Sequence, residues 1–250
     1  MTPNELIEAV GHSPALLVGY PAGIALALVA LVLRWRAVPL QPAAPADHGM
    51  LAATWLALAL STPPPLAPLR YGADLLVILL LLEWPRWRVG GAGLGAALGA
   101  YPAVLLALAC LATSGGGLMP AGAWVLPAAA TPAQQACFWL GIAAWALALP
   151  GLVRNPAPVP AAPLHQALGL LRGAGHLVLA AAPWLGLIAA HEPPAPWLLP
   201  LPVGGLALWC AGAARAHPSV IAISERLAAA LGIIALSGAG LWSLAERLGR

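Results

Sequence analysis

The stretch QACFWLGIAAWALALPGLV, residues 135–153, decides the fold class of this chain. It carries no charged side chain over nearly the length, roughly 20 residues, that a helix needs to cross a bilayer. Similar apolar blocks recur along the chain and are separated by Pro, Gly and Arg. This pattern is typical of several membrane-spanning helices, and it lacks the alternation of polar and apolar residues expected of a membrane β-barrel.

The composition points to the same class of protein. Hydrophobic residues make up 61% of the 250 residues and charged residues only 8%, with a mean hydropathy of +0.88. A soluble domain has about a quarter charged residues, so we exclude a soluble enzyme, a nucleic-acid-binding protein and a disordered chain. The sequence predicts an all-α polytopic membrane protein that forms a single integral membrane domain over residues 1–250.

The apolar blocks predict about eight transmembrane helices. The second is interrupted by prolines 63–65, and the third is short and has acidic residues near both ends. The expected spans are approximately 14–33, 50–68, 72–84, 94–112, 135–153, 174–190, 197–213 and 227–244.

The arginines predict how these spans are oriented. With the N-terminus outside, eight of the eleven basic residues fall in inner loops, and the positive-inside rule favours this arrangement. Both termini are then outside, and residues 154–172 form an inner loop. The inner arginines are Arg34, Arg36, Arg86, Arg88, Arg154, Arg172, Arg215 and Arg226, and the outer ones are Arg70, Arg247 and Arg250.

Few titratable residues fall inside the expected spans. Ionisable groups within a bilayer are costly and are functional candidates by default, so we consider Asp74, His176 and the nearby Gln166 as a possible intramembrane polar site. The alternative for Asp74 is a place at the outer membrane surface. Glu83 lies among Trp and Arg residues, and we interpret it as an interfacial anchor paired with an arginine one turn further on.

Other residue types suggest structural roles. Cys110, Cys137 and Cys210 stand alone in apolar runs, and we expect them to be small buried residues. The glycines near 93–99 and 232–240 favour close contact between helices. No nucleophile elbow, phosphate-binding loop or zinc-protease motif is present, so we expect no catalytic residue and no metal site in this chain.

A family resemblance rests on several fragments in a fixed order. The main ones are Arg154-Asn155-Pro156 and the stretch His165–Leu177, HQALGLLRGAGHL. Further fragments are Arg34-Trp35-Arg36, the Gln41-Pro42…Asp47 loop, Gly72–Leu76, Gly95–Leu106 and Ala213–Arg215. Together they resemble the membrane-anchor subunit of energy-converting hydrogenases and formate hydrogenlyase, which is homologous to the quinone-site membrane subunit (subunit 1, the NADH dehydrogenase subunit 1 family) of respiratory complex I.

The resemblance implies a multi-pass subunit of the prokaryotic cell inner membrane, with eight spans and an outer N-terminus. Its partners would be hydrophilic Fe–S or hydrogenase-like subunits, antiporter-like membrane subunits and membrane lipid, and not nucleic acid. Fe–S clusters, with a NiFe centre or quinone as further candidates, would reside in partner subunits, and this chain would be a non-catalytic subunit of an oxidoreductase complex. On the inner face, the candidate docking residues are Arg34, Arg36, Arg154, His165 and Arg172. The alternative role for these residues is simple positive-inside anchoring.

Several positions depart from the family pattern. Gln166 stands where a Glu is usual, Leu170–Arg172 replace a normally acidic stretch, residues 97–99 lack an expected Arg-Glu pair, and Tyr101 replaces another Glu. A Gln or Leu side chain cannot bind and release a proton. We therefore expect a subunit of electron transport with reduced or lost proton translocation. The alternative function is a stand-alone small-molecule or ion transporter with a site around Asp74 and His176.

Overall fold

The computed structural model describes residues 74–89, 98–115, 129–153, 163–189, 200–215 and 217–249, and positions 49–50, 53–54, 57, 118 and 126–127. At 163–167, 170, 178, 182, 185–189, 200, 203, 214 and 218 it describes the backbone only. The described part of the chain is all helical, without strands. Its helices are α5 (Leu75–Val89), α7 (Ala100–Gly115), α9 (Pro132–Val153), α10 (Pro163–Ala189), α11 (Pro200–Arg215) and α12 (Pro218–Leu248).

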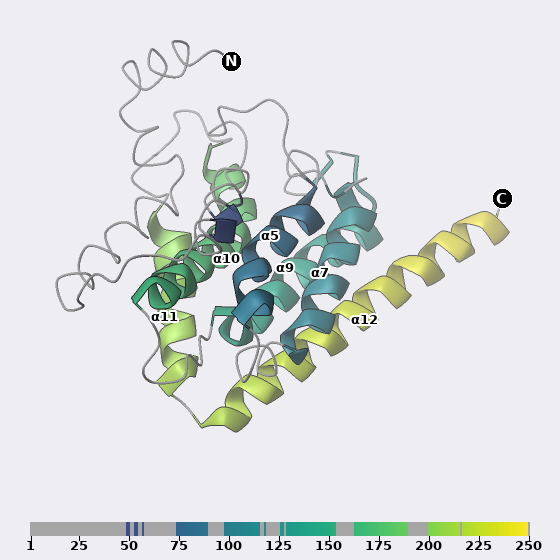
Figure 1. Cartoon of the computed structure of the whole chain (residues 1–250). Helices are drawn as coiled ribbons and strands as arrows, with labels where there is room; N and C mark the ends of the chain where they lie inside the picture. Colours follow the sequence, from purple (N-terminus) through teal and green to yellow (C-terminus); the bar gives the residue numbers. More distant parts are fainter. Residues whose placement is uncertain are drawn as a thin grey trace, which may run out of the picture.

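Helix α9 is the centre of the packing. It contacts α7, α10, α11 and α12, while α5 packs on α10 (Figure 1). The core between these helices is aliphatic and includes Ile78 and Leu82 from α5, Ala107 from α7, and Leu149 from α9, all fully buried. Among the described residues, Trp145 of α9 is the largest fully buried side chain.

Two close helix contacts depend on glycine. A Cβ atom added at Gly141 of α9 would lie 2.8 Å from Cβ of Cys110 on α7, and one added at Gly232 of α12 would lie 2.7 Å from Cβ of Leu106. Both distances are too short for real carbon atoms. The expectation of close packing therefore holds for Gly232, whereas a Cβ at Gly238 or Gly240 would meet nothing within 4 Å.

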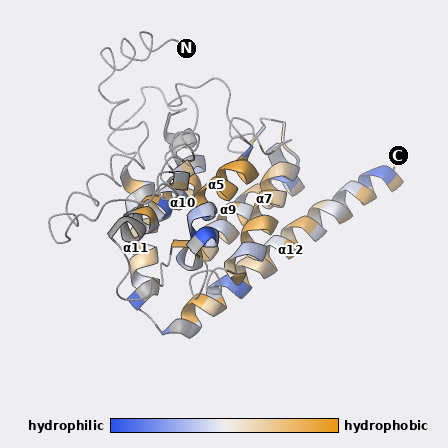
Figure 2. Ribbon diagram, viewed as in Figure 1, coloured by the Kyte–Doolittle hydropathy of each residue, from blue (hydrophilic) through white to orange (hydrophobic). Residues whose placement is uncertain are grey.

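Two described helices are long and apolar enough to cross a membrane by length and composition, namely α9 and residues 219–248 of α12. Most of α9 is buried inside the protein, whereas α12 is largely exposed. Figure 1 shows α12 running beside α7 and α9 and then extending beyond them to the C-terminus. Figure 2 shows orange, hydrophobic ribbon along much of α12, with hydrophilic residues at its C-terminal end.

Several expected boundaries are corrected by the structure. Helix α10 begins at Pro163 rather than near 174, so residues 163–172 are helical and not part of a loop. Helix α5 continues to Val89, past the expected end at 84. The extension of α5 carries Arg86 and that of α10 carries Arg172, and both arginines pair with Glu83 inside the protein. These charges are therefore stable within a helix and need no water-exposed loop. Helix α12 begins at Pro218 rather than 227, because Pro218 suits the first turn and the His217 side chain accepts a hydrogen bond from the backbone N–H of Ser219.

Other expectations agree with the structure or lie outside it. The spans expected at 135–153 and 197–213 match α9 and α11 within a few residues, and the span expected at 94–112 overlaps α7. The first span, 14–33, lies outside the described residues. Of the second, 50–68, only positions 50, 53–54 and 57 are described, and all are helical.

Candidate functional site

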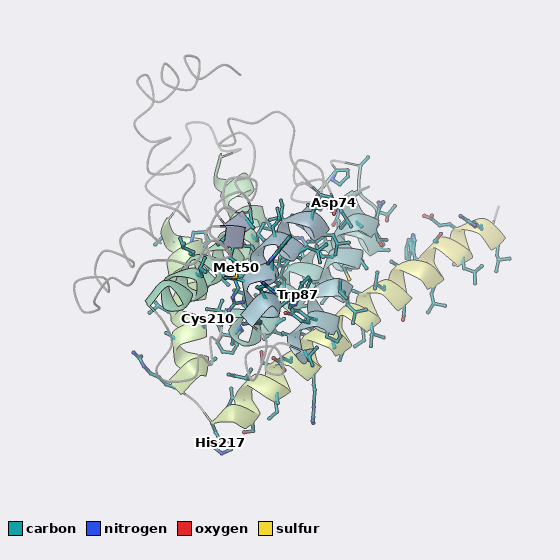
Figure 3. All side chains as sticks on the ribbon, viewed as in Figure 1. Met50, Asp74, Trp87, Cys210 and His217 are labelled. Atoms are coloured by element: carbon teal, nitrogen blue, oxygen red, sulfur yellow. The ribbon has the colours of Figure 1, made fainter. Side chains whose placement is uncertain are left out.

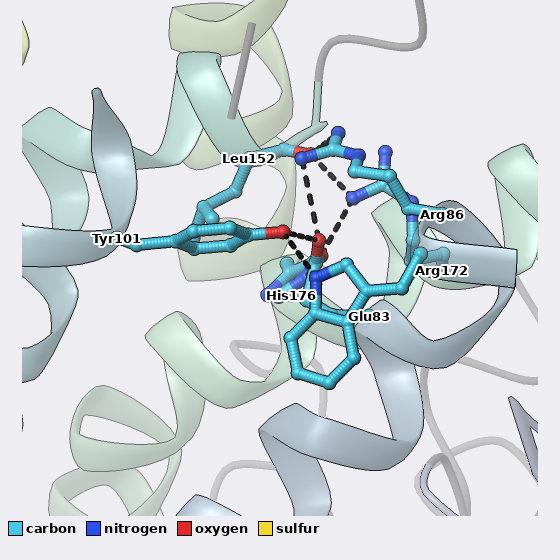
Figure 4. A network of polar contacts seen from close by, with 7 residues as sticks. Glu83, Arg86, Tyr101, Leu152, Arg172 and His176 are labelled. Carbon is cyan, nitrogen blue, oxygen red and sulfur yellow. Dashed lines mark hydrogen bonds and ion pairs between the residues drawn. The ribbon is translucent and has the colours of Figure 1, made fainter. Parts of the chain in front are cut away.

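A buried cluster of charged residues joins four helices, with Glu83 of α5 at its centre (Figure 4). Glu83 is 3% exposed, Arg172 of α10 is 2% exposed and His176 of α10 is fully buried. Arg172 Nη1 donates to Glu83 Oε1 at 2.8 Å, and His176 Nε2 lies 2.7 Å from the same oxygen. Arg172 and His176 are four residues apart, so they project from one face of α10.

The second carboxylate oxygen of Glu83 has its own partners. The hydroxyl of Tyr101, in the first turn of α7, donates to Glu83 Oε2 at 2.5 Å. Arg86 Nη1 lies 3.3 Å from Glu83 Oε2. The indole N–H of Trp87 donates to the Tyr101 oxygen at 3.1 Å. Trp87, labelled in Figure 3, is exposed and so links the cluster to the surface of α5. Glu83 therefore has two hydrogen-bonded or ion-paired partners on each oxygen.

Both arginines also bind the end of α9. Arg86 Nη2 and Arg172 Nη1 each donate to the backbone carbonyl of Leu152 at 2.6 Å. The last carbonyls of a helix have no partner within the helix, and its C-terminus carries partial negative charge. The two guanidinium groups therefore balance both the Glu83 carboxylate and the end of α9.

The protonation of His176 follows from its partner. A carboxylate facing two guanidinium groups can only accept hydrogen bonds, so Nε2 of His176 carries the hydrogen and donates it. Among the residues that the structure describes, Nδ1 of His176 has no hydrogen-bond partner. Buried polar atoms are usually hydrogen-bonded, which makes this nitrogen a candidate for contact with a ligand.

The predicted polar residues lie in different places. Asp74 caps the start of α5, where its Oδ1 accepts a hydrogen bond from the backbone N–H of Leu76 at 2.7 Å. Glu83 lies nine positions further along, a helical rise of about 14 Å. Gln166 lies in the second turn of α10, and its side chain is not described. The structure thus brings His176 together with Glu83.

The predicted docking residues are partly outside the described chain. Arg34, Arg36 and Arg154 are not described, and His165 lies in α10 with its side chain undescribed. Docking would require the Arg172 guanidinium to lie on the protein surface. Instead, Arg172 is buried and ion-paired with Glu83. Of the arginines expected on the inner side, Arg88, Arg215 and Arg226 are described and exposed.

Glu83 was interpreted as an interfacial anchor paired with an arginine one turn further on. The pairing is confirmed by the contact with Arg86. The structure adds that Glu83, Pro85 and Arg86 are buried, while Trp84 and Trp87 face outward. The i, i+4 spacing of Arg172 and His176 within the apolar stretch 167–189 is the sequence signal that could have indicated an acidic partner inside the protein.

A second carboxylate, Glu225 of α12, lies at the same end of the helices. A Cβ added at Gly99 or at Gly151 would overlap its carboxylate oxygens. Gly99 precedes α7 by one residue, and Gly151 is in the last turn of α9. Glu225 therefore lies close in sequence to Tyr101, which binds Glu83, and to Leu152, which binds Arg86 and Arg172. The adjacent Ser224 hydroxyl donates to the Leu147 carbonyl of α9. The Glu225 carboxylate lies in the space that these two glycines leave open.

The three cysteines fit the sequence-based expectation. Cys110, Cys137 and Cys210 are free and buried. The Cys137 thiol contacts the Cys110 carbonyl at 3.6 Å, and the Cys110 thiol contacts the Gly232 carbonyl at 3.7 Å. In the described residues, no group of three or more His, Cys, Asp or Glu side chains could hold a metal ion.

Comparisons with family models, with curated proteins and with solved structures find no match.

Proposed function

We propose that this chain is a membrane-anchor subunit of a complex-I-like or group 4 hydrogenase-like redox assembly. It would dock a hydrophilic Fe–S module to antiporter-like membrane subunits. The proposal rests on the ordered fragments of the resemblance and on the positive-inside count. We further propose that the chain spans the prokaryotic inner membrane eight times, with both termini outside.

The observation that carries this proposal is the meeting of Glu83, Tyr101, Leu152 and Arg172 in one cluster. In the proposed topology these residues occupy the inner ends of four successive spans. Their contact supports an alternating arrangement of α5, α7, α9 and α10. A rigid, charge-bonded inner end would give a hydrophilic module a fixed surface on which to dock.

The cluster also supports a reduced or lost proton pathway. A carboxylate that is held by two guanidinium groups, a hydroxyl and an imidazole is stabilised in one charge state. A proton carrier must instead change its charge state readily. Purified complex in liposomes tests this point: a proton gradient that disappears in a Glu83→Gln complex retaining all of its subunits and its redox activity would contradict it.

Docking would use exposed cations on the inner side. Arg215 and Arg226 are exposed and are expected on the inner side, whereas Arg247 is exposed and expected on the outer side. Exposed charges act over about 8–10 Å at physiological ionic strength, so a salt-sensitive interaction with an acidic surface is expected.

Gentle-detergent purification of the chain from its native membrane, with mass spectrometry of the retained proteins, tests the proposal. Fe–S, hydrogenase-like or antiporter-like subunits should accompany the chain. Arg215→Glu combined with Arg226→Glu should lower the yield of the hydrophilic subunits, and the matched control Arg247→Glu should not. A chain that purifies alone, or only with itself, would contradict an anchor function.

The second candidate is a stand-alone small-molecule or ion transporter. The specific observation in its favour is the fully buried His176, whose Nδ1 lacks a partner in the described residues, beside Glu83. Buried polar groups in membrane helices often mark transport pathways. The purified chain alone in liposomes should then move a solute or an ion, and His176→Leu should abolish the flux.

A further inference from the structure

An apolar groove lies between α9, α10 and α11 and has no role in the proposed function. Its volume is about 690 Å³, within the roughly 300–1,000 Å³ of typical ligand pockets. From α9 it is lined by Trp139, Ile142, Ala143 and Ala146, which recur at the spacing of one helix face. Trp184 of α10 closes one side, with its ring centroid 5.7 Å from that of Trp139.

The groove opens on the exposed surface of the three helices. Trp139 is 41% exposed, Trp184 40% and Leu201 of α11 63%. Gly205 of α11 also lines the groove, and a Cβ added there would meet nothing within 4 Å. Among the residues that the structure describes, none fills the space beside Gly205.

The chemistry of the lining indicates which kind of ligand the groove can bind. The lining side chains are aliphatic or indole, and no charged residue is among them. A ligand with polar groups inside the groove would lose its hydrogen bonds to water without replacement. A flexible hydrocarbon chain meets no such penalty, and it can be continuous with the lipid around exposed apolar helices.

The position of the groove matches one leaflet of the bilayer. Trp139 and Leu201 lie near the starts of α9 and α11 and Trp184 near the end of α10, which are the outer ends in the proposed topology. From Trp139 to Ala146 the groove runs along about 10 Å of helix, roughly a third of the hydrocarbon core. We propose that this groove binds one acyl chain of an outer-leaflet phospholipid.

Filling the groove tests the proposal. The full chain is purified in mild detergent with any subunits that accompany it and washed extensively, and the phospholipid retained per chain is measured by mass spectrometry. Gly205→Leu should retain one phospholipid fewer than the wild type. Gly212→Leu is the matched control, because Gly212 is also in α11, has open space beside it and does not line the groove. Equal retention in all three proteins would overturn the proposal.

A second measurement uses the unchanged chain, so it does not depend on the folding of a variant. Phosphatidylcholine with a photoreactive diazirine in one acyl chain is reconstituted with the protein and irradiated. Crosslinks should map to 139–146 and 201–206. Crosslinks confined to other segments would overturn the proposal, and so would an isoprenoid quinone or another polypeptide occupying the groove.

Discussion

Replacing Glu83 with Gln tests whether the buried cluster stabilises the helix packing. Gln has nearly the same shape as Glu, but it leaves Arg86 and Arg172 without a counter-charge at distances of 3.3 and 2.8 Å. The amide nitrogen of Gln is a hydrogen-bond donor, and each oxygen position of Glu83 already faces donors. Arg172 and His176 contact one oxygen. Tyr101 and Arg86 contact the other.

The burial of the cluster determines how much stability the Glu83→Gln change should cost. Removing one partner of a buried ion pair costs about 3–5 kcal/mol, because the remaining charge is buried and uncompensated. We expect Glu83→Gln to lower the free energy of unfolding by this amount. The matched control is Glu246→Gln, because Glu246 is exposed and accepts a hydrogen bond from the Trp242 indole at 3.0 Å. This surface change should alter stability by no more than about 0.5 kcal/mol.

The assay is equilibrium unfolding of the purified chain in mixed micelles of mild detergent and dodecyl sulfate, followed by circular dichroism. A double variant, Glu83→Gln with Arg172→Gln, should lose less stability than the sum of the two single variants, since paired residues are not additive. A Glu83→Gln protein within about 1 kcal/mol of the wild type, together with strict additivity, would refute the ionic role of the cluster.

Three further predictions concern single positions. Tyr101→Phe should cost about 1.5–3 kcal/mol of unfolding free energy in the same assay, because hydrogen bonds to charged groups contribute that much; an unchanged stability would show that the bond to Glu83 contributes nothing. Gly141→Ala should lower the free energy of unfolding by about 1–3 kcal/mol through overpacking. The control Gly212→Ala should leave it unchanged or raise it by up to about 1 kcal/mol through helix propensity. Equal effects of the two changes would contradict the close contact between α7 and α9. The three buried cysteines should resist a maleimide reagent in the folded chain and react after unfolding in dodecyl sulfate, and fast labelling of folded protein would contradict their burial.

The sequence could predict the helical class and several helix positions because these depend on local composition. The apolar stretch at 135–153 needs only its own residues to be recognised, and α9 matches it within three residues. Helix ends were harder to predict where a charge is neutralised by a distant partner. Arg172 was expected in a loop, and the partner that permits its burial is Glu83, 89 positions earlier.

The buried cluster illustrates the same limit. His176 and Arg172 were both considered, but for different roles, since a linear pattern does not show that α5 and α10 are neighbours. Glu83, Trp84 and Arg86 together have the composition of an interfacial segment. Which of these side chains faces inward depends on the packing of α5 against α10, and this packing is a property of the tertiary structure.

Glu83 and Arg172 are far apart in the sequence, so the ribosome makes them at different times. At about 5–20 residues per second, the ribosome needs roughly 4–18 s to make the chain that separates them. During this time α5 is complete, and its carboxylate lacks its main partner. Arg86, only three positions away, can pair with Glu83 as soon as the helix forms. Pairing with Arg86 can therefore neutralise the Glu83 carboxylate while the chain up to α10 is being made.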